Sequence, residues 1–291
     1  MTNNQGNKLK DYLELAKINI MIPVALTGFT GYFIFDPHLS LRIFITSCGI
    51  LLMAISASVL NQVQEMETDG KMARTRNRPL PLHRVSVQGA TIFILINLLA
   101  GIILIYYGGN LKAVVIGLIT IVWYNGIYTY AKRITAFAVV PGAITGALPP
   151  LIGWVAAGGS LWEKPVLFVE FLIFTGQIPH FWLLILKYGE EYKQAGIPSL
   201  TDVFSPKQIK RLTFTWVVSS VFAALFLCYF EIIHSHIVIL ILVMASIYII
   251  WQFSTLLKIR AKSNNYKRYS MFLDLYFLLI LLLLISDRII G

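Results

Sequence analysis

The sequence has little charge and few cysteines. Asp, Glu, Lys and Arg make up 13% of its 291 residues, whereas 57% are hydrophobic. A water-soluble domain carries roughly 25% charged residues, so this composition excludes an ordinary soluble protein and predicts an integral membrane protein. Cys48 and Cys228 lie inside apolar runs, where cysteine behaves as a small hydrophobic residue. Their positions indicate neither a disulfide framework nor a thiolate metal site.

Long apolar runs are the main feature of the sequence. Nine of them approach the roughly 20 residues that a helix needs to cross the hydrocarbon core of a bilayer. We expect these spans at residues 18–35, 41–60, 90–107, 111–130, 137–157, 166–186, 213–230, 236–257 and 271–290. Residues 1–291 are therefore predicted to form a single all-α membrane domain, a bundle of nine transmembrane helices.

Basic residues alternate between the two sides of this predicted bundle. Most of the 24 basic residues lie before the first span or in the loops after the second, fourth, sixth and eighth spans. The exceptions are Arg42, Lys112, Lys164 and Arg288. The positive-inside rule then places the N-terminus in the cytoplasm and the C-terminus outside. This topology accounts for the net charge of +10, so nucleic acid is not expected as a partner.

The stretch after the second span carries a pattern suited to chemistry. Asn61, Glu65 and Asp69 recur every four residues, so on a continuing helix they would share one face. Oxygen ligands of this kind suit Mg²⁺. The basic residues that follow are Lys71, Arg74, Arg76 and Arg78. Because guanidinium groups bind phosphate oxygens in a bidentate way, the stretch predicts a Mg²⁺–diphosphate site at the cytoplasmic face. A loop that holds lipid headgroups would explain the arginines but not the aligned oxygen ligands.

A second candidate group lies at the cytoplasmic end of the fourth span. Tyr128 and Lys132 are one helical turn apart, and Arg133 follows. Lysine can counter the charge of a diphosphate, and tyrosine can donate a hydrogen bond to it or face a developing cation. The alternative is an interfacial anchor of aromatic and basic residues, which is common at helix ends.

The third candidate group belongs to the sixth span and the loop after it. A histidine at membrane depth, here His180, is by default a functional-site hypothesis, and Pro179 is expected to kink the helix and open a cavity. The alternative is a histidine satisfied by a neighbouring helix. Glu190 and Glu191 return to the cytoplasmic side, either as a second metal position or in a solvated loop. For Asp274, spacing predicts no partner.

Together these residues resemble the UbiA superfamily of intramembrane prenyltransferases. Its first motif, Asn-x₃-(Asp/Glu)-x₃-Asp-x₂-Met-x-Arg-Thr-x₂-Arg-Pro, is present without a gap. The matching residues are Asn61, Glu65, Asp69, Met72, Arg74, Thr75, Arg78 and Pro79. The superfamily's Tyr-x₃-Lys pattern falls on Tyr128 and Lys132.

Within the superfamily, the chain is most similar to the haem O synthases, or protohaem IX farnesyltransferases. The matching segments are Pro179-His180-Phe181, Glu191-Tyr192, Ala195-Gly196 with Pro198, and the glycine- and proline-rich residues 142–154. That last stretch also predicts close helix packing. The chain departs from the pattern where Glu191 replaces the usual Asp, where Ile18 replaces the proline expected after Lys17, and at residues 136–138 and 176–178.

The resemblance implies transfer of a farnesyl group from farnesyl diphosphate to a vinyl group of haem B, with addition of water, giving haem O and diphosphate. It assigns one Mg²⁺ to Asn61, Glu65 and Asp69, and a second to Glu191, with or without Glu190. The residues assigned to the substrates are Lys17, Arg74, Arg78, Tyr128, Lys132, Arg133 and His180. The catalytic residues among the whole set are Asp69, Lys132 and His180. His180 would ligate the haem iron, hydrogen-bond the haem or act as a base.

The implied setting is a bacterial-type inner or plasma membrane. Expected partners are farnesyl diphosphate, haem B, the lipid bilayer, haem A synthase and oxidase assembly proteins. One alternative is a prenyltransferase of the same superfamily that acts on a quinone precursor, a chlorophyll-type molecule or a lipid. Another is a transporter with an anion site, although no pair of broken helices marks two related halves.

Overall fold

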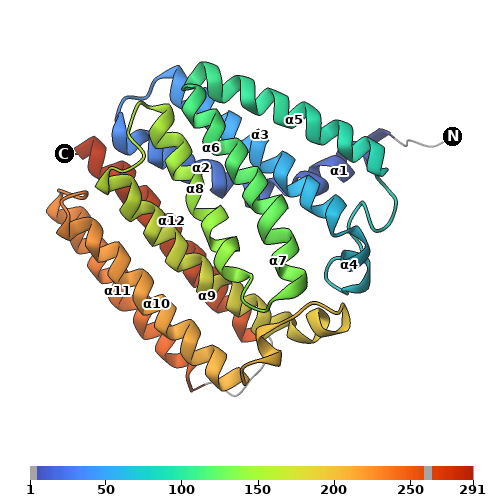
Figure 1. Ribbon diagram of the computed structural model, residues 1–291. Coiled ribbons are helices and arrows are strands. Elements are labelled where there is room, and N and C mark those ends of the chain that lie inside the picture. Colours follow the sequence, from blue (N-terminus) through green and yellow to red (C-terminus); the bar gives the residue numbers. More distant parts are fainter. Residues whose placement is uncertain (1–4, 259–263, 291) are drawn as a thin grey trace.

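The computed structural model describes residues 5–258 and 264–290, and in these ranges every regular element is a helix. The helices are α1 Gln5–Ala16, α2 Ile18–Phe35, α3 Leu41–Gln64, α4 Met66–Lys71, α5 Val87–Gly108, α6 Leu111–Val122, a π-helix Trp123–Tyr128, α7 Thr129–Ile134, α8 Val139–Ala156, α9 Lys164–Gln194, a 3₁₀ turn Leu200–Asp202, α10 Pro206–Tyr229, α11 His236–Leu256 and α12 Asn264–Ile290. Figure 1 shows them as one bundle.

The nine predicted spans are confirmed. Within the described residues, nine helical segments are long and apolar enough to cross a membrane, and α6, the π-helix and α7 together form one of them. Large apolar side chains such as Ile96 and Leu240 are more than 60% exposed. Such exposure over a whole bundle is expected of a surface that faces lipid. Arg260 and Lys262, which belong to the predicted basic loop after α11, lie outside the described residues.

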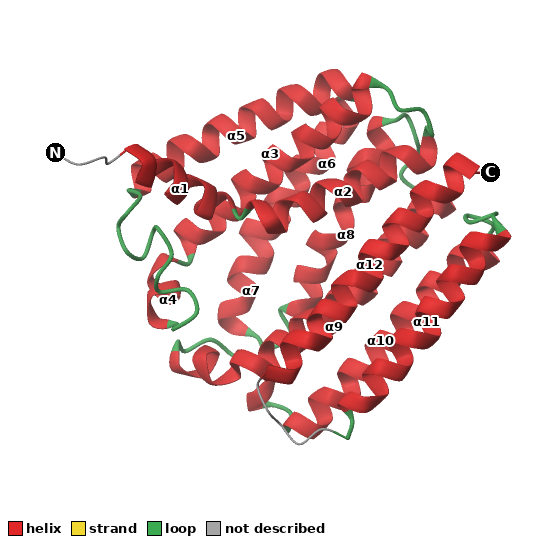
Figure 2. Ribbon diagram, turned by 180° about the vertical axis from the view of Figure 1, so that it is seen from behind, coloured by secondary structure: helices red, strands yellow, loops and turns green. Residues whose placement is uncertain are grey.

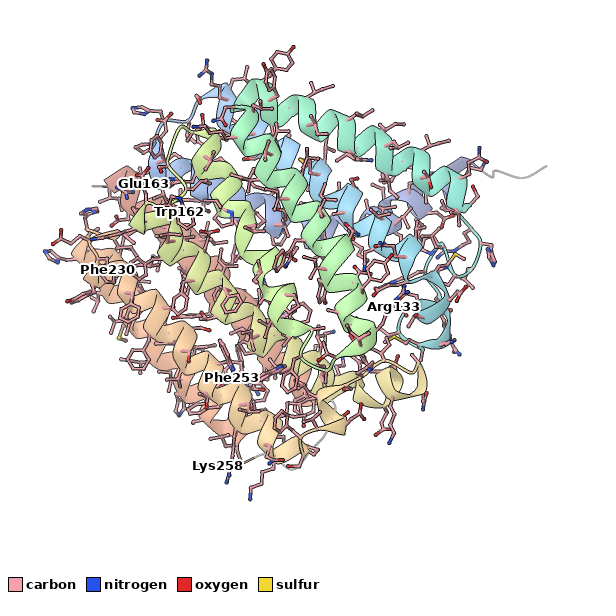
Figure 3. All side chains as sticks on the ribbon, viewed as in Figure 1. Arg133, Trp162, Glu163, Phe230, Phe253 and Lys258 are labelled. Atoms are coloured by element: carbon pink, nitrogen blue, oxygen red, sulfur yellow. The ribbon has the colours of Figure 1, made fainter. Side chains whose placement is uncertain are left out.

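The loops alternate between two ends of the bundle. Figure 3 places Trp162, Glu163 and Phe230 at one end, with Arg133 and Lys258 away from them. We call the second end, which carries α4, the end of α7 and the C-terminal part of α9, the basic end (Figures 1 and 2). Helix α1 and the C-terminal end of α12 lie at opposite ends of the bundle (Figure 1), as an odd number of spans requires.

Helices α2 and α8 cross in close contact at the centre of the bundle. A Cβ atom added at Gly153 would lie 1.8 Å from the Gly28 carbonyl oxygen, and one added at Gly31 would lie 2.0 Å from the Pro150 carbonyl oxygen. Backbones can approach this closely only where side chains are absent. The close packing predicted for residues 142–154 is therefore confirmed.

We expect Gly153→Ala to destabilise the protein by about 3 kcal/mol, the upper part of the range for overpacked cores, because the backbone of α2 cannot yield as a side chain would. Gly126→Ala is the matched control, since a Cβ there meets only Val122, at 3.9 Å. Thermal unfolding in detergent measures both variants. Equal melting temperatures for the two would contradict the crossing.

Candidate active site

The first candidate motif does not lie on one continuous helix. α3 ends at Gln64 and α4 begins at Met66, with Glu65 between them at φ −106° and ψ 9°. The helix that would place Asn61, Glu65 and Asp69 on one face is therefore interrupted at Glu65. One-turn backbone bonds persist on both sides of the interruption, from Glu65 N–H to the Asn61 carbonyl oxygen at 3.0 Å and from Asp69 N–H to the Glu65 carbonyl oxygen at 2.7 Å.

Two of the three motif residues contact the α7 segment. The Asn61 side-chain NH₂ group donates to Thr129 Oγ1 at 3.0 Å. This bond leaves the side-chain amide oxygen, Oδ1, to other partners. Glu65 Oε1 lies 2.5 Å from Lys132 Nζ, and both of these side chains are largely buried. The acidic motif and the Tyr-x₃-Lys pattern thus form one cluster, although they are 67 residues apart in the sequence.

Lys132 also lies over an aromatic surface. Its ammonium group is 4.9 Å from the centre of the Tyr128 ring, and Tyr124 stacks on that ring at 5.5 Å. Both tyrosines belong to the π-helix, a rare element that is frequently found at functional sites. The Tyr128 ring also approaches Phe181 of α9, with 6.1 Å between the ring centres. The Tyr128–Lys132 pairing predicted from the sequence is confirmed, whereas Tyr124 was not singled out.

Asp69 pairs with the last arginine of its own motif. Arg78 Nη1 lies 2.6 Å from Asp69 Oδ2, and the carboxylate is almost fully buried. Thr75 Oγ1 donates to the Asp69 carbonyl oxygen at 2.8 Å, which folds the loop back onto α4. Farther along, Arg84 bonds to Asp11 of α1, so α1 holds the same loop in place.

Glu191 reaches the cluster from α9. α9 continues to Gln194, beyond the predicted end at residue 186, so Glu191 lies on a helix and not in a loop. Its Oε2 accepts a hydrogen bond from the Arg74 backbone N–H at 2.9 Å, while the Arg74 guanidinium lies over the Tyr188 ring at 5.1 Å. Glu190 is exposed, so the geometry favours Glu191 over Glu190 as the acidic contributor from α9.

Lys17 joins this group from the turn between α1 and α2. It adopts a left-handed backbone conformation, with φ 49°, which is uncommon for a residue other than glycine and worth a functional explanation. Burial, and then the positive charge of Arg78, lower the pKa of Lys17 to about 7, against an opposing effect of Asp69. Near neutral pH this amine therefore lies close to its point of half-protonation.

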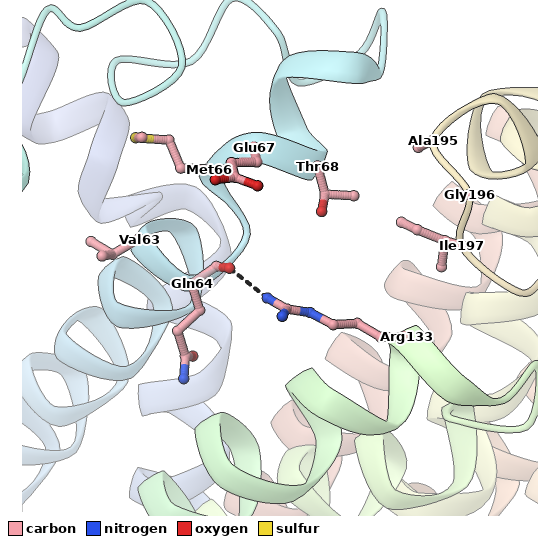
Figure 4. Close-up of a pocket in the computed structure, with 9 residues that line it drawn as sticks. All are labelled: Val63, Gln64, Met66, Glu67, Thr68, Arg133, Ala195, Gly196 and Ile197. Atoms are coloured by element: carbon pink, nitrogen blue, oxygen red, sulfur yellow. Dashed lines mark hydrogen bonds between the residues drawn. The ribbon is translucent and has the colours of Figure 1, made fainter.

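Arg133 faces a neighbouring pocket. Its Nη2 donates to the Gln64 carbonyl oxygen at 2.6 Å, at the point where α3 ends. Figure 4 shows the guanidinium group on one side of a pocket of about 450 Å³. The other lining residues are Val63, Gln64, Met66, Glu67, Thr68, Ala195, Gly196 and Ile197. The pocket lies between α4 and the segment after α9, and none of the acidic residues of the cluster nor Lys132 lines it.

His180 points to a different helix. Its Nδ1 lies 3.1 Å from Asp274 Oδ1 of α12, so the prediction that Asp274 has no partner is wrong. Pro179 lies inside α9, which is helical without interruption from Lys164 to Gln194. Phe181, the next residue along, contacts Tyr128, so His180 lies beside the cluster and not within it.

The oxygen ligands of the cluster fit a hard divalent cation. In the described part of the chain, no three His, Cys, Asp or Glu side chains gather into a metal site on their own. Each carboxylate has a nitrogen partner instead: Lys132 for Glu65, Arg78 for Asp69 and the Arg74 N–H for Glu191. The donors are carboxylates with the Asn61 amide oxygen, the chemistry that Mg²⁺ prefers. The basic partners would then be available to an anion bound beside the metal.

Comparisons with known proteins agree with the geometry of the cluster. The chain matches the UbiA prenyltransferase family over residues 21–278. It is 34% identical to a protoheme IX farnesyltransferase of Oleidesulfovibrio alaskensis over 76% of this chain and 78% of that protein. It is 37% identical to one of Cytophaga hutchinsonii over 67% and 68%.

Solved structures show the same fold. A digeranylgeranylglyceryl phosphate synthase has a TM-score of 0.77 at 21% identity, over 98% of this chain and 100% of that one. A UbiA homologue from Archaeoglobus fulgidus, bound to GPP and Mg²⁺, has a TM-score of 0.68 at 15% identity, over 96% and 98%.

Proposed function

Because the chain belongs to the UbiA prenyltransferase family, we propose that it transfers the farnesyl group of farnesyl diphosphate to a vinyl group of haem B and adds water, giving haem O and diphosphate. The observation that carries the proposal is the cluster at the basic end, where Glu65, Asp69 and Glu191 each meet a basic or N–H partner. The positive-inside rule makes this end cytoplasmic.

The basic residues of the cluster bind the diphosphate. With Mg²⁺ held by Glu65 and Asp69, their present partners Lys132 and Arg78 would be available to the phosphate oxygens, and Lys17 would add a third positive charge. When bound, Mg²⁺ held by Asn61, Glu65, Asp69 and Glu191 supplies Lewis-acid stabilisation of the leaving diphosphate. Fixed charges that face the site where negative charge develops lower the barrier without reorganisation.

Ionisation breaks the allylic C–O bond, and the electron pair leaves with the diphosphate. The Tyr128 ring lies beside Lys132 and stacks on Tyr124, and this aromatic pair stabilises the positive charge on the farnesyl carbon. The apolar bundle takes the farnesyl chain and excludes water until the carbon–carbon bond forms. The π electrons of the haem vinyl group form that bond, and water then adds to the resulting cation and loses a proton.

Diphosphate release tests this function against its alternatives. Purified protein in lipid nanodiscs, given farnesyl diphosphate and Mg²⁺, is expected to release diphosphate when haem B is present. Release with a quinone precursor but not with haem B would redirect the assignment to another acceptor within the family. No release with any acceptor would favour the transporter alternative.

The two adjacent glutamates of α9 form a matched pair. Glu191→Ala is expected to lower kcat/KM for farnesyl diphosphate by about 10–100-fold, the usual effect of losing a residue that supports a metal site, because it removes an oxygen ligand and the contact with Arg74. Glu190→Ala, at an exposed position, is expected to stay within about twofold of the unaltered enzyme. Steady-state kinetics of both variants decide the assignment, and the reverse order of effects would overturn it.

Lys17 predicts a pH dependence of diphosphate binding. With a pKa of about 7, the free lysine is protonated at pH 6 and mostly neutral at pH 8.5. A bound diphosphate favours the charged form, so binding takes up a proton above pH 7 and weakens by up to about tenfold per pH unit. Isothermal calorimetry of a non-reactive farnesyl diphosphate analogue, in buffers of different ionisation enthalpy, measures this uptake.

Lys17→Arg serves as the control for that measurement. Arginine stays charged over the whole range, so its diphosphate affinity is expected to follow only the ionisation of the ligand. The same proton uptake in both proteins would exclude Lys17 as the titrating group.

A further inference from the structure

The His180–Asp274 pair lies on the part of α9 next to the cluster but belongs to none of its contacts. The two side chains connect α9 with α12 at 3.1 Å, and both helices are membrane-spanning segments. The side chain of His180 is 33% exposed and that of Asp274 is 62% exposed. The pair is therefore open to its surroundings and not enclosed between the helices.

Neighbouring contacts place the pair between the closest approach of α9 and α12 and the cluster at the basic end. One turn before His180, a Cβ atom at Gly176 would lie 1.9 Å from the Phe277 ring, so the helices are in close contact there. Phe277 follows Asp274 by one turn of α12, which runs antiparallel to α9. From His180, α9 continues 11 residues to Glu191, roughly 16 Å at the helical rise. A porphyrin at His180 would lie next to Phe181, whose ring approaches Tyr128 of the cluster.

An exposed carboxylate at membrane depth requires an explanation. Acidic side chains within spanning helices are costly; almost all of them face the bundle interior or a water-filled cavity, pair with another polar group and mark a functional site. A pair that served only to fasten two helices would be expected in the shielded contact, where Gly176 and Phe277 already lie. Asp274 instead lies on the exposed side, where a ligand that arrives from the bilayer would meet it.

The chemistry of the pair points to a metal ligand. When Asp274 accepts the Nδ1–H of His180, the imidazole is fixed in the tautomer with an unprotonated Nε2, the arrangement that carboxylate–histidine pairs give to metal-binding histidines. We propose that His180 Nε2 is the axial ligand of the iron of the haem acceptor and that Asp274 is its positioning residue, at the lipid-facing junction of α9 and α12. This inference rests on the proposed function, and it names the feature that selects a metalloporphyrin over a quinone.

Haem binding can be measured without farnesyl transfer. The unaltered protein in lipid nanodiscs, without farnesyl diphosphate, is titrated with ferric haem B and followed by its Soret absorption and electron paramagnetic resonance. We expect a histidine-ligated spectrum that is lost in His180→Ala and restored by added imidazole. Asp274→Asn is expected to weaken haem affinity by about 10–100-fold, and Asp274→Glu to restore most of it.

Metal-free protoporphyrin IX separates ligation from packing. It has the same ring and side groups but no iron, so its affinity is expected to be equal in the unaltered protein, His180→Ala and Asp274→Asn. Melting temperatures of the variants verify that each is folded. A histidine-ligated spectrum that persists in His180→Ala, or an equal loss of protoporphyrin affinity, would overturn the proposal.

The two proposals can fail separately. Haem O formation by the unaltered enzyme, with no spectral change in His180→Ala, would remove the iron-ligand role and leave the farnesyltransferase function in place. Histidine ligation in an enzyme that forms no haem O would do the reverse.

Discussion

Asp69→Ala is expected to lower kcat/KM for farnesyl diphosphate by about 10²–10³-fold, the scale on which loss of a single group that stabilises transition-state charge acts. The carboxylate is almost fully buried and holds Arg78 at 2.6 Å. Its removal takes away a metal donor and also leaves a half-buried guanidinium without its partner. Both effects act on the group that binds the diphosphate.

The matched control for Asp69 is Glu67, an exposed carboxylate two residues earlier on α4. Glu67→Ala is expected to stay within about twofold of the unaltered kcat/KM. Thermal unfolding in detergent verifies that the Asp69 variant remains folded. Retained turnover in folded Asp69→Ala protein would refute the role of the cluster.

Metal removal is expected to have an effect of similar size. Chelation with EDTA should reduce diphosphate release by about 10³-fold or more, since the charge of the leaving group would then be opposed by side chains alone. Added Mg²⁺ should restore activity. Ca²⁺ should restore much less, because it prefers longer bonds and more ligands than Mg²⁺. Turnover that is insensitive to chelation would contradict the donor assignment of Asn61, Glu65, Asp69 and Glu191.

The spans were predictable because hydropathy over about 20 residues is a strong local signal. The first predicted span, 18–35, coincides with α2. At the end of the bundle opposite the basic end, most other predicted spans begin or end within a few residues of the observed helices. The boundaries at the basic end were predicted less accurately. α9 continues through Lys187 and Glu191, because a helix can extend past the hydrocarbon where hydropathy no longer reports it.

The composition of the cluster was also predictable, but its contacts were not. The motif spacing identified Asn61, Glu65 and Asp69, yet the interruption at Glu65 accompanies an ion pair with Lys132, which no local pattern contains. The π-helix likewise has no composition rule that separates it from an α-helix. It brings Tyr124 against Tyr128, and the sequence offered no reason to single out Tyr124.

Long-range pairs were the main omission. Asp274 had no partner at helical spacing because its partner, His180, lies on another span. The ion pair between Arg84 of the loop and Asp11 of α1 was also missed, because its members are far apart in the sequence. The signal available in the sequence was the cost of an ionisable residue at membrane depth, which identifies Asp274 as unusual without naming what it contacts.

Mass spectrometry of the product tests the central claim most directly. Purified enzyme is incubated with haem B, farnesyl diphosphate and Mg²⁺ in ¹⁸O-labelled water. We predict a product with the mass of haem B plus one farnesyl group and one hydroxyl group, with its new oxygen drawn from the solvent, and we predict its absence with Asp69→Ala. Diphosphate release without this product, or a product that persists in the Asp69 variant, would contradict the account.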